Sequence, residues 1–123
     1  MESNQLSEWI IEQANDAIIY SNLEGIIGYW NAAACELFGY SKAEALGESL
    51  NLIIPEHLRK PHWHGFYAAI ESGDLKLSGK PTVTRALHKD RTQKLYVEMS
   101  FALIKDHQNQ VQGSVSIARK VTG

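Results

Sequence analysis

Cysteine is almost absent from this chain, and a strong charge of either sign is missing. A single cysteine occurs among 123 residues, which excludes an internal disulfide and a cysteine-rich zinc site. The formal net charge is only −2, whereas nucleic-acid binding requires a basic face. We therefore expect a protein of a reducing compartment, the cytoplasm, that has no direct contact with nucleic acid.

Long apolar runs and catalytic motifs are missing as well. No run approaches the length of a membrane span, and the polar, acidic start of the chain lacks the basic and apolar regions of a signal peptide. No serine lies in a nucleophile-elbow pattern, and no glycine-rich phosphate loop occurs. These absences predict a domain that does not touch a membrane and is not itself an enzyme.

The chain does contain enough apolar sequence for one core, since 44% of its residues are hydrophobic. Leu6, Trp9 and Ile10 recur at helical spacing and predict an amphipathic flanking helix over residues 1–15. This helix either packs on its own domain or forms a dimer contact that transmits a signal. Residues 16–123 are expected to form a single domain.

Five strand-like runs and several capped helices follow. The runs are residues 17–20, 26–30, 81–87, 94–104 and 111–119. Between the second and third runs, Asn31 is placed to cap a short helix that Gly39 ends, and Ser41 with Glu44 has the spacing of a capping box. Strands grouped in this way with short helices indicate an α+β domain, in which helices gather on one face of an antiparallel sheet.

Six segments in this order resemble the PAS family of sensor domains. They are NLEGII (22–27), WNAAA (30–34), LFGYSKAEALG (37–47), IPE (54–56), HKDRT (88–92) and SIARKVT (116–122). The resemblance covers nearly the whole chain from residue 7. It implies a five-stranded antiparallel sheet in the order 2-1-5-4-3, short helices on one face and an N-terminal flanking helix.

The resemblance also implies a role in signal transduction. Such a domain is the sensory input of a larger regulator, and it binds a small ligand in its pocket, forms a homodimer, or does both. The attached effector would be a histidine kinase of a bacterial-type two-component system, a cyclic-dinucleotide enzyme or a transcription regulator. In this chain Asp90-Arg91 replaces the Asp-Gly usual in the family, and Arg119-Lys120 replaces the usual Arg-Asp.

One helix after residue 60 is expected to face the pocket. Pro61 is suited to its first turn and Gly73 to its end. At 100° per residue His62, Phe66 and Ile70 share an apolar face, whereas His64 points away. The predicted pocket residues are His62, Phe66, Ile70, Arg85, Met99, Phe101 and Val115.

His62 suggests one specific alternative, a haem-based gas sensor. Residues 55–62 are similar to the haem-binding PAS domains of rhizobial oxygen-sensing kinases, and aligned from Pro55 the proximal iron ligand of those domains falls on His62. Position near a helix N-terminus would keep the imidazole neutral. Arg85 or Met99 would lie on the distal side, although a strict count places Thr82 there. The competing interpretation is a hydrogen-bonded core histidine.

Two other cofactors are disfavoured, and the identity of any cofactor stays open. Flavin chemistry of the light-oxygen-voltage type needs a cysteine in the segment after Gly47, where residues 48–52 have none. Zinc held by His57, His62 and His64 fails because residues 62 and 64 lie on opposite sides of a helix.

Overall fold

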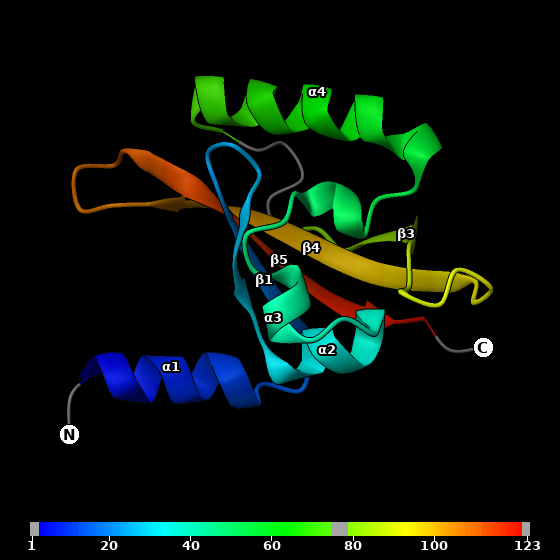
Figure 1. Cartoon of the computed structure of the whole chain (residues 1–123). Helices are drawn as coiled ribbons and strands as arrows, with labels where there is room; N and C mark the ends of the chain where they lie inside the picture. The colour runs from blue at the N-terminus through cyan, green and yellow to red at the C-terminus, as the bar shows by residue number, and fades with distance from the viewer. Residues whose placement is uncertain (1–2, 75–78, 122–123) are drawn as a thin grey trace.

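The computed structural model describes residues 3–74 and 79–121, which form a sheet with helices over it (Figure 1). The elements in chain order are α1 (Ser3–Gln13), β1 (Ala17–Asn22), β2 (Ile27–Trp30), α2 (Ala32–Phe38), α3 (Lys42–Ala45), the 3-10 helix η1 (Leu50–Leu52), α4 (Glu56–Ser72), β3 (Thr82–Ala86), β4 (Leu95–Lys105) and β5 (Val111–Lys120). The five strands are antiparallel and lie in the order β2-β1-β5-β4-β3. This confirms the predicted α+β fold and its strand order.

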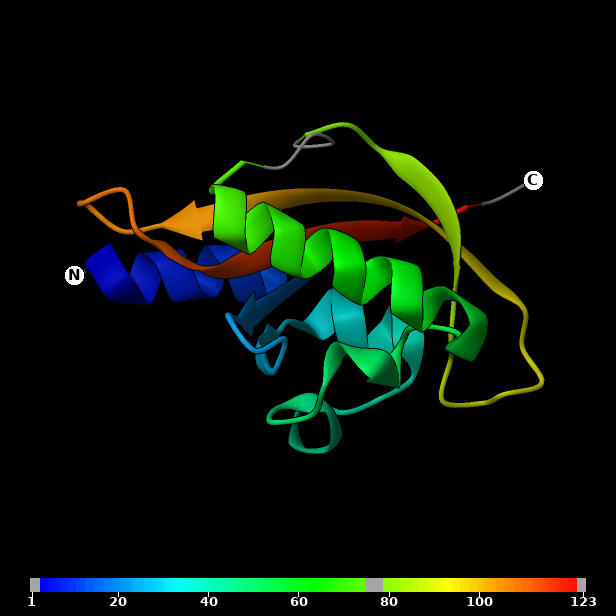
Figure 2. The same cartoon turned by 90° about the horizontal axis from the view of Figure 1, so that it is seen from above.

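Alternation along the strands decides which face of the sheet is buried. On β1, Ala17, Ile19 and Ser21 are buried, and on β4 Leu95, Val97 and Met99 are buried, while their neighbours are more exposed. Because successive side chains of a strand point to opposite faces, these residues form one inner face. The helices α2, α3 and α4 lie over it, as Figures 1 and 2 show.

The short helices form where local signals predicted them. The Asn31 side chain accepts from the backbone N–H of Ala34 at the start of α2, and Gly39 ends the helix with φ 84°. Ser41 and Glu44 form the reciprocal capping box of α3. Phe38 of α2 and Trp30 of β2 are almost completely buried, with ring centroids 5.5 Å apart, so α2 is fixed to the core.

The helix α4 begins five residues earlier than the sequence predicts. Its first residue is Glu56, preceded by Pro55, and Pro61 lies inside it. Proline is tolerated in the first turn because its missing N–H has no helical partner there, which is why the sequence predicts a start at Pro61, whereas proline in a helix interior removes one backbone hydrogen bond. His62 therefore lies in the second turn, beyond the reach of the N-terminal dipole.

No helix within the described residues is long and apolar enough to cross a bilayer.

Candidate ligand-binding site

Two adjoining cavities lie between α4 and the inner face of the sheet. The first has a volume of about 250 Å³ and is lined by Leu50, Ile53, Ile54, Pro55, Leu58, His62, Thr82, Thr84, Arg85, Ala86, Met99, Phe101 and Ser116. The second has a volume of about 220 Å³ and is lined by Leu50, Pro61, His62, Gly65, Phe66, Ala69, Phe101, Leu103, Ser114 and Ser116. Most of these side chains are apolar, as in binding sites for small organic molecules.

Four residues line both cavities and therefore form the junction between them. Phe101 and Ser116 are direct partners on the neighbouring strands β4 and β5, and they supply the floor. His62 of α4 and Leu50 of η1 supply the opposite side. The cavities are thus two lobes that meet at one imidazole and one hydroxyl group.

The His62 imidazole is unusual because none of the described residues hydrogen-bonds to it. Its Nδ1 atom is buried without a partner, and its ring lies 4.7 Å from that of Trp63 and 5.9 Å from that of Phe66 between centroids. Burial lowers the pKa of the His62 imidazole from its ordinary value near 6.5. The neutral form predicted from the sequence is therefore favoured, but by loss of hydration rather than by a helix N-terminus.

Trp63 and Arg59 hold α4 against the segment before it. The Trp63 indole N–H donates to Asn51 Oδ1 at 2.8 Å, and its ring lies where a Cβ on Gly25 would stand, 2.2 Å from that position. The Arg59 Nε–H donates to the Ile54 carbonyl oxygen at 3.0 Å. These contacts tie α4 to η1 and to the β1–β2 turn, so the helix is anchored beside the cavities.

The structure brings five of the seven predicted pocket residues to the cavities: His62, Phe66, Arg85, Met99 and Phe101. Ile70 and Val115 line neither cavity. Val115 lies between the buried residues Ser114 and Ser116 of β5, so strand alternation directs it to the outer face.

Arg85 touches the first cavity, but its side chain belongs to the outer face. Thr84 and Ala86 on either side pair with the buried residues Val97 and Leu95, whereas Arg85 pairs with Tyr96, which is exposed. The count that favoured Thr82 agrees with this register, since Thr82 pairs with Met99 and lines the cavity.

Sequence reasoning missed Thr84 and Ser116 because it assigned their larger neighbours, Arg85 and Val115, to the inner face. On β5 the inner positions hold Ser114, Ser116 and Ala118, while the outer positions hold Val115 and Ile117. The row of small residues at every second position was the available signal, because small side chains on an inner face leave room for a ligand.

The remaining histidines of the central segment do not contribute to the cavities. His57 and His64 are exposed, and no group of three metal-ligating side chains gathers within residues 3–74 and 79–121. Cys35, on α2, is half-buried and packs against the core.

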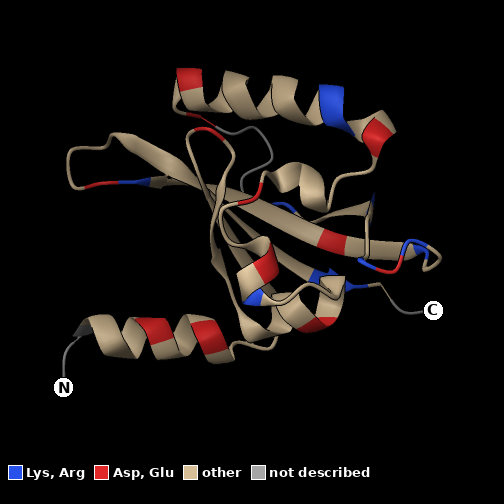
Figure 3. Ribbon diagram, in the orientation of Figure 1, with Lys and Arg blue, Asp and Glu red and all other residues tan. Residues whose placement is uncertain are grey.

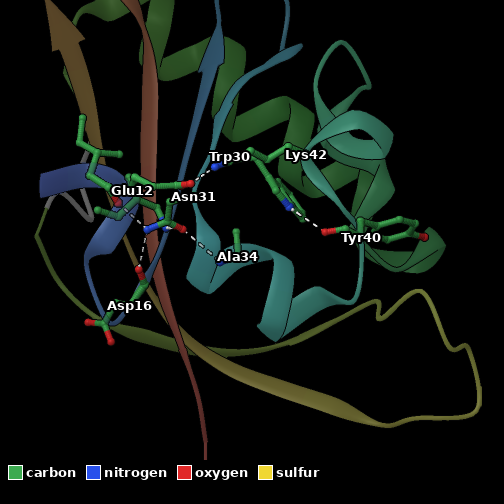
Figure 4. Close-up of polar contacts among 9 residues, drawn as sticks. Glu12, Asp16, Trp30, Asn31, Ala34, Tyr40 and Lys42 are labelled. Carbon is green, nitrogen blue, oxygen red and sulfur yellow. Dashed lines mark hydrogen bonds and ion pairs between the residues drawn. The ribbon is translucent and has the colours of Figure 1, made fainter. Parts of the chain in front are cut away.

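A second polar centre connects α1 to the domain, and Asn31 is its hub (Figure 4). The Asn31 Oδ1 atom accepts from the N–H groups of Ile18 at 2.9 Å and Ala34 at 3.0 Å. Its Nδ2 group donates to the carbonyl oxygens of Ile11 at 2.8 Å and Asp16 at 3.0 Å. Sequence reasoning saw only the cap, because the other three partners come from α1, the following turn and β1.

Two ion pairs reinforce this connection. Lys42 of α3 pairs with Glu12 of α1, and Arg119 near the end of β5 pairs with Asp16 at 2.7 Å. Figure 3 shows acidic positions and no basic ones along α1. The start of β1 and the end of β5 are therefore held together beside the C-terminal end of α1.

The apolar face of α1 is only partly covered. Leu6, Trp9 and Ile10 are 44%, 48% and 61% exposed, and Tyr29 and Leu46 beside Trp9 are also exposed. The three residues predicted as a dimer contact thus remain accessible in the single chain.

The comparison with known proteins agrees with this architecture. The model of the PAS fold matches residues 7–121, and the chain belongs to the PAS family, whose members are sensory modules. A solved PAS domain from Colwellia psychrerythraea is 25% identical and covers 98% of both chains, with a TM-score of 0.83.

Two curated relatives are larger signalling proteins. The sensor protein FixL of Bradyrhizobium diazoefficiens is 40% identical over 53 residues, which are 43% of this chain and 10% of FixL. A probable serine/threonine-protein kinase of Dictyostelium discoideum is 32% identical over 76 residues, which are 62% of this chain and 5% of the kinase. The chain therefore matches only a small part of each relative.

Proposed function

We propose that this chain is a signal-input module that binds a small organic molecule between α4 and the sheet and thereby controls an attached effector. The observation that supports this is the pair of apolar cavities that meet at His62 and Ser116. The matched relatives are a sensor protein and a kinase, so the effector we propose is a histidine kinase, a cyclic-dinucleotide enzyme or a transcription regulator in the cytoplasm. Any catalysis would belong to that effector.

The β5 strand offers a route from the cavities to α1. Ser116 forms part of the floor, and three residues later Arg119 pairs with Asp16, whose carbonyl oxygen also accepts from Asn31. A ligand that favours one position of β5 would therefore favour one position of α1. This coupling requires that the ligand bind the two arrangements with different affinity.

A fluorescent neutral probe tests ligand binding directly. N-phenyl-1-naphthylamine should bind the wild-type chain with an increase in emission, and Ser116→Leu should abolish the increase because the added side chain fills the junction. Ile117→Leu is the matched control, since Ile117 is the next residue of β5 and lies on the outer face at 40% exposure. Equal probe binding by both variants, with circular dichroism showing both folded, would overturn the proposal.

Self-association through α1 is the second part of the proposed function. We propose that α1, which spans Ser3–Gln13 of the flanking segment expected over residues 1–15, presents the exposed residues Leu6, Trp9 and Ile10 so that they bury one another in a homodimer. The triple alanine variant should sediment as a monomer at concentrations where the wild type sediments as a dimer. Unchanged sedimentation of the variant would refute this contact.

A haem-based gas sensor with His62 as the iron ligand is the second candidate, favoured by the neutral, unpaired imidazole. Neither lobe alone reaches the roughly 300 Å³ at which pockets for drug-sized ligands begin, so a rigid porphyrin would have to extend through the junction into both lobes. Ultraviolet-visible spectra with and without added haemin, beside His62→Ala, separate the two candidates. A Soret band that depends on His62 would establish haem and displace the organic ligand.

A further inference from the structure

The two lobes restrict which small molecule can bind, and this inference rests on the proposed function. We propose that the ligand is an uncharged, mainly apolar molecule with two ring-sized ends and one hydrogen-bonding group between them. Each end would occupy one lobe, and the central group would lie at the junction beside His62 and Ser116.

The elongated shape of the proposed ligand follows from the division of the cavity into two lobes. The lobes have similar volumes, about 250 and 220 Å³, and share only Leu50, His62, Phe101 and Ser116. A compact ligand would fill one lobe and leave the other empty. An elongated ligand removes apolar surface of both lobes from water, and the free energy of binding increases with that buried area.

The absence of charge follows from the residues that line the lobes. No aspartate, glutamate or lysine occurs among the described lining residues, and the one arginine, Arg85, is directed by strand register to the outer face. An ionised ligand would lose its hydration without gaining an opposite charge, which is costly in an apolar site.

The central polar group follows from the two unpaired groups at the junction. Neither ring nitrogen of His62 is hydrogen-bonded to a described residue, and the same holds for the Ser116 hydroxyl group. The Ser114 hydroxyl differs, because it pairs with that of Ser21 at 3.2 Å. A neutral imidazole offers one donor and one acceptor, so either a carbonyl or a hydroxyl group of a ligand can satisfy it.

A panel of shape-matched compounds tests each element of this proposal by titration calorimetry. Benzophenone and diphenylmethanol carry a central polar group, diphenylmethane has the same two rings without it, and diphenylacetate adds a charge. The better of the two polar compounds should bind about tenfold more tightly than diphenylmethane, as one added hydrogen bond implies. Diphenylacetate should bind at least about a hundredfold more weakly than that polar compound, and the single-ring acetophenone at least about tenfold more weakly than benzophenone.

The variant His62→Phe assigns the preference to the imidazole, because it keeps an aromatic ring and removes both nitrogens. It should bind diphenylmethane with unchanged affinity and lose the preference for the polar compounds. Equal affinity of polar and apolar compounds in the wild type, tighter binding of diphenylacetate, or a preference that persists in His62→Phe would each overturn the inference. Binding of N-phenyl-1-naphthylamine without binding of any two-ring compound would overturn the inference alone, whereas failure of every compound and of the probe would overturn the proposed function too.

Discussion

Asn31 and His62 are polar residues that the fold treats in opposite ways. Asn31 is buried and uses its side chain in four hydrogen bonds, to Ile11, Asp16, Ile18 and Ala34. His62 makes no such bond to a described residue, and its Nδ1 atom is buried. An unpaired buried polar atom costs about 1–3 kcal/mol. The contrast teaches that the chain itself satisfies the polar groups at the junction with α1, whereas it leaves the imidazole beside the cavities without a hydrogen-bond partner among the described residues.

The helix that Asn31 caps, α2, and the helix that contains His62, α4, differ in how much of each is buried. In the seven-residue α2, Ala34 and Phe38 are completely buried in the core. In the seventeen-residue α4, Ala69 is the only buried residue, and cavities separate parts of the helix from the sheet. Structural elements with few buried contacts open and shift most readily, so we expect α4 to be the element that responds to a ligand.

The largest expected effect comes from breaking the Asn31 side of this comparison. Asn31→Ala removes all four hydrogen bonds and leaves buried backbone groups unpaired, so the free energy of unfolding should fall by about 3 kcal/mol or more. Urea unfolding measures this fall in the free energy of unfolding. Asn22→Ala is the control, because Asn22 accepts two bonds in an exposed turn and should cost less than about 1.5 kcal/mol. Equal losses in the two variants would contradict the special role of Asn31.

A smaller effect is expected where Trp63 meets the β1–β2 turn. Gly25→Ala places a Cβ 2.2 Å from the Trp63 ring at a φ of +77°, whereas Gly47→Ala has a φ of +87° and nothing within 4 Å. Both variants pay the backbone cost of about 1–3 kcal/mol, and Gly25→Ala should lose about 1–2 kcal/mol more through the clash. Thermal unfolding of the pair measures the difference. If the two glycines tolerate alanine equally, Trp63 does not anchor α4 to the turn.

The smallest effect, and one of opposite sign, is expected at His62. His62→Leu removes an unpaired buried nitrogen, so the free energy of unfolding should stay unchanged or rise by about 1 kcal/mol. Urea unfolding at pH 7.5 measures this change. A loss of stability comparable with that of Asn31→Ala would show that the His62 imidazole is already hydrogen-bonded and would contradict the contrast with Asn31.

The pH dependence of stability tests whether the His62 imidazole is buried in its neutral form. The folded state lowers the pKa of His62, so below about pH 6.5 the unfolded chain binds more protons than the folded one. Stability contributed by the neutral imidazole is therefore complete above about pH 6.5 and decreases as the pH falls below that value. His62→Leu should lose this part of the pH dependence. Identical pH profiles would contradict burial of the imidazole.

Local sequence signals predicted much of this molecule correctly. Asn31 and Gly39 define the ends of α2, Ser41 and Glu44 cap α3, and the strict alternation from Leu95 to Met99 marks the inner face of β4. Each of these signals acts within a few residues, so it can be recognised without knowing the fold. The inward face shared by His62 and Phe66 was predicted in the same way and reaches the cavities.

Contacts between distant segments decided the rest. The α4 helix includes Pro61 because it begins at Glu56, directly after Pro55, and because Trp63 and Arg59 anchor it to Asn51 of η1. The inward direction of Ser116 in place of Val115 follows from pairing with Phe101, a partner fifteen positions earlier in the printed sequence. The sequence alone determined the elements and their order, since capping and periodicity are local. Only the tertiary structure left His62 unpaired between two lobes, because hydrogen bonding and burial depend on which segments meet.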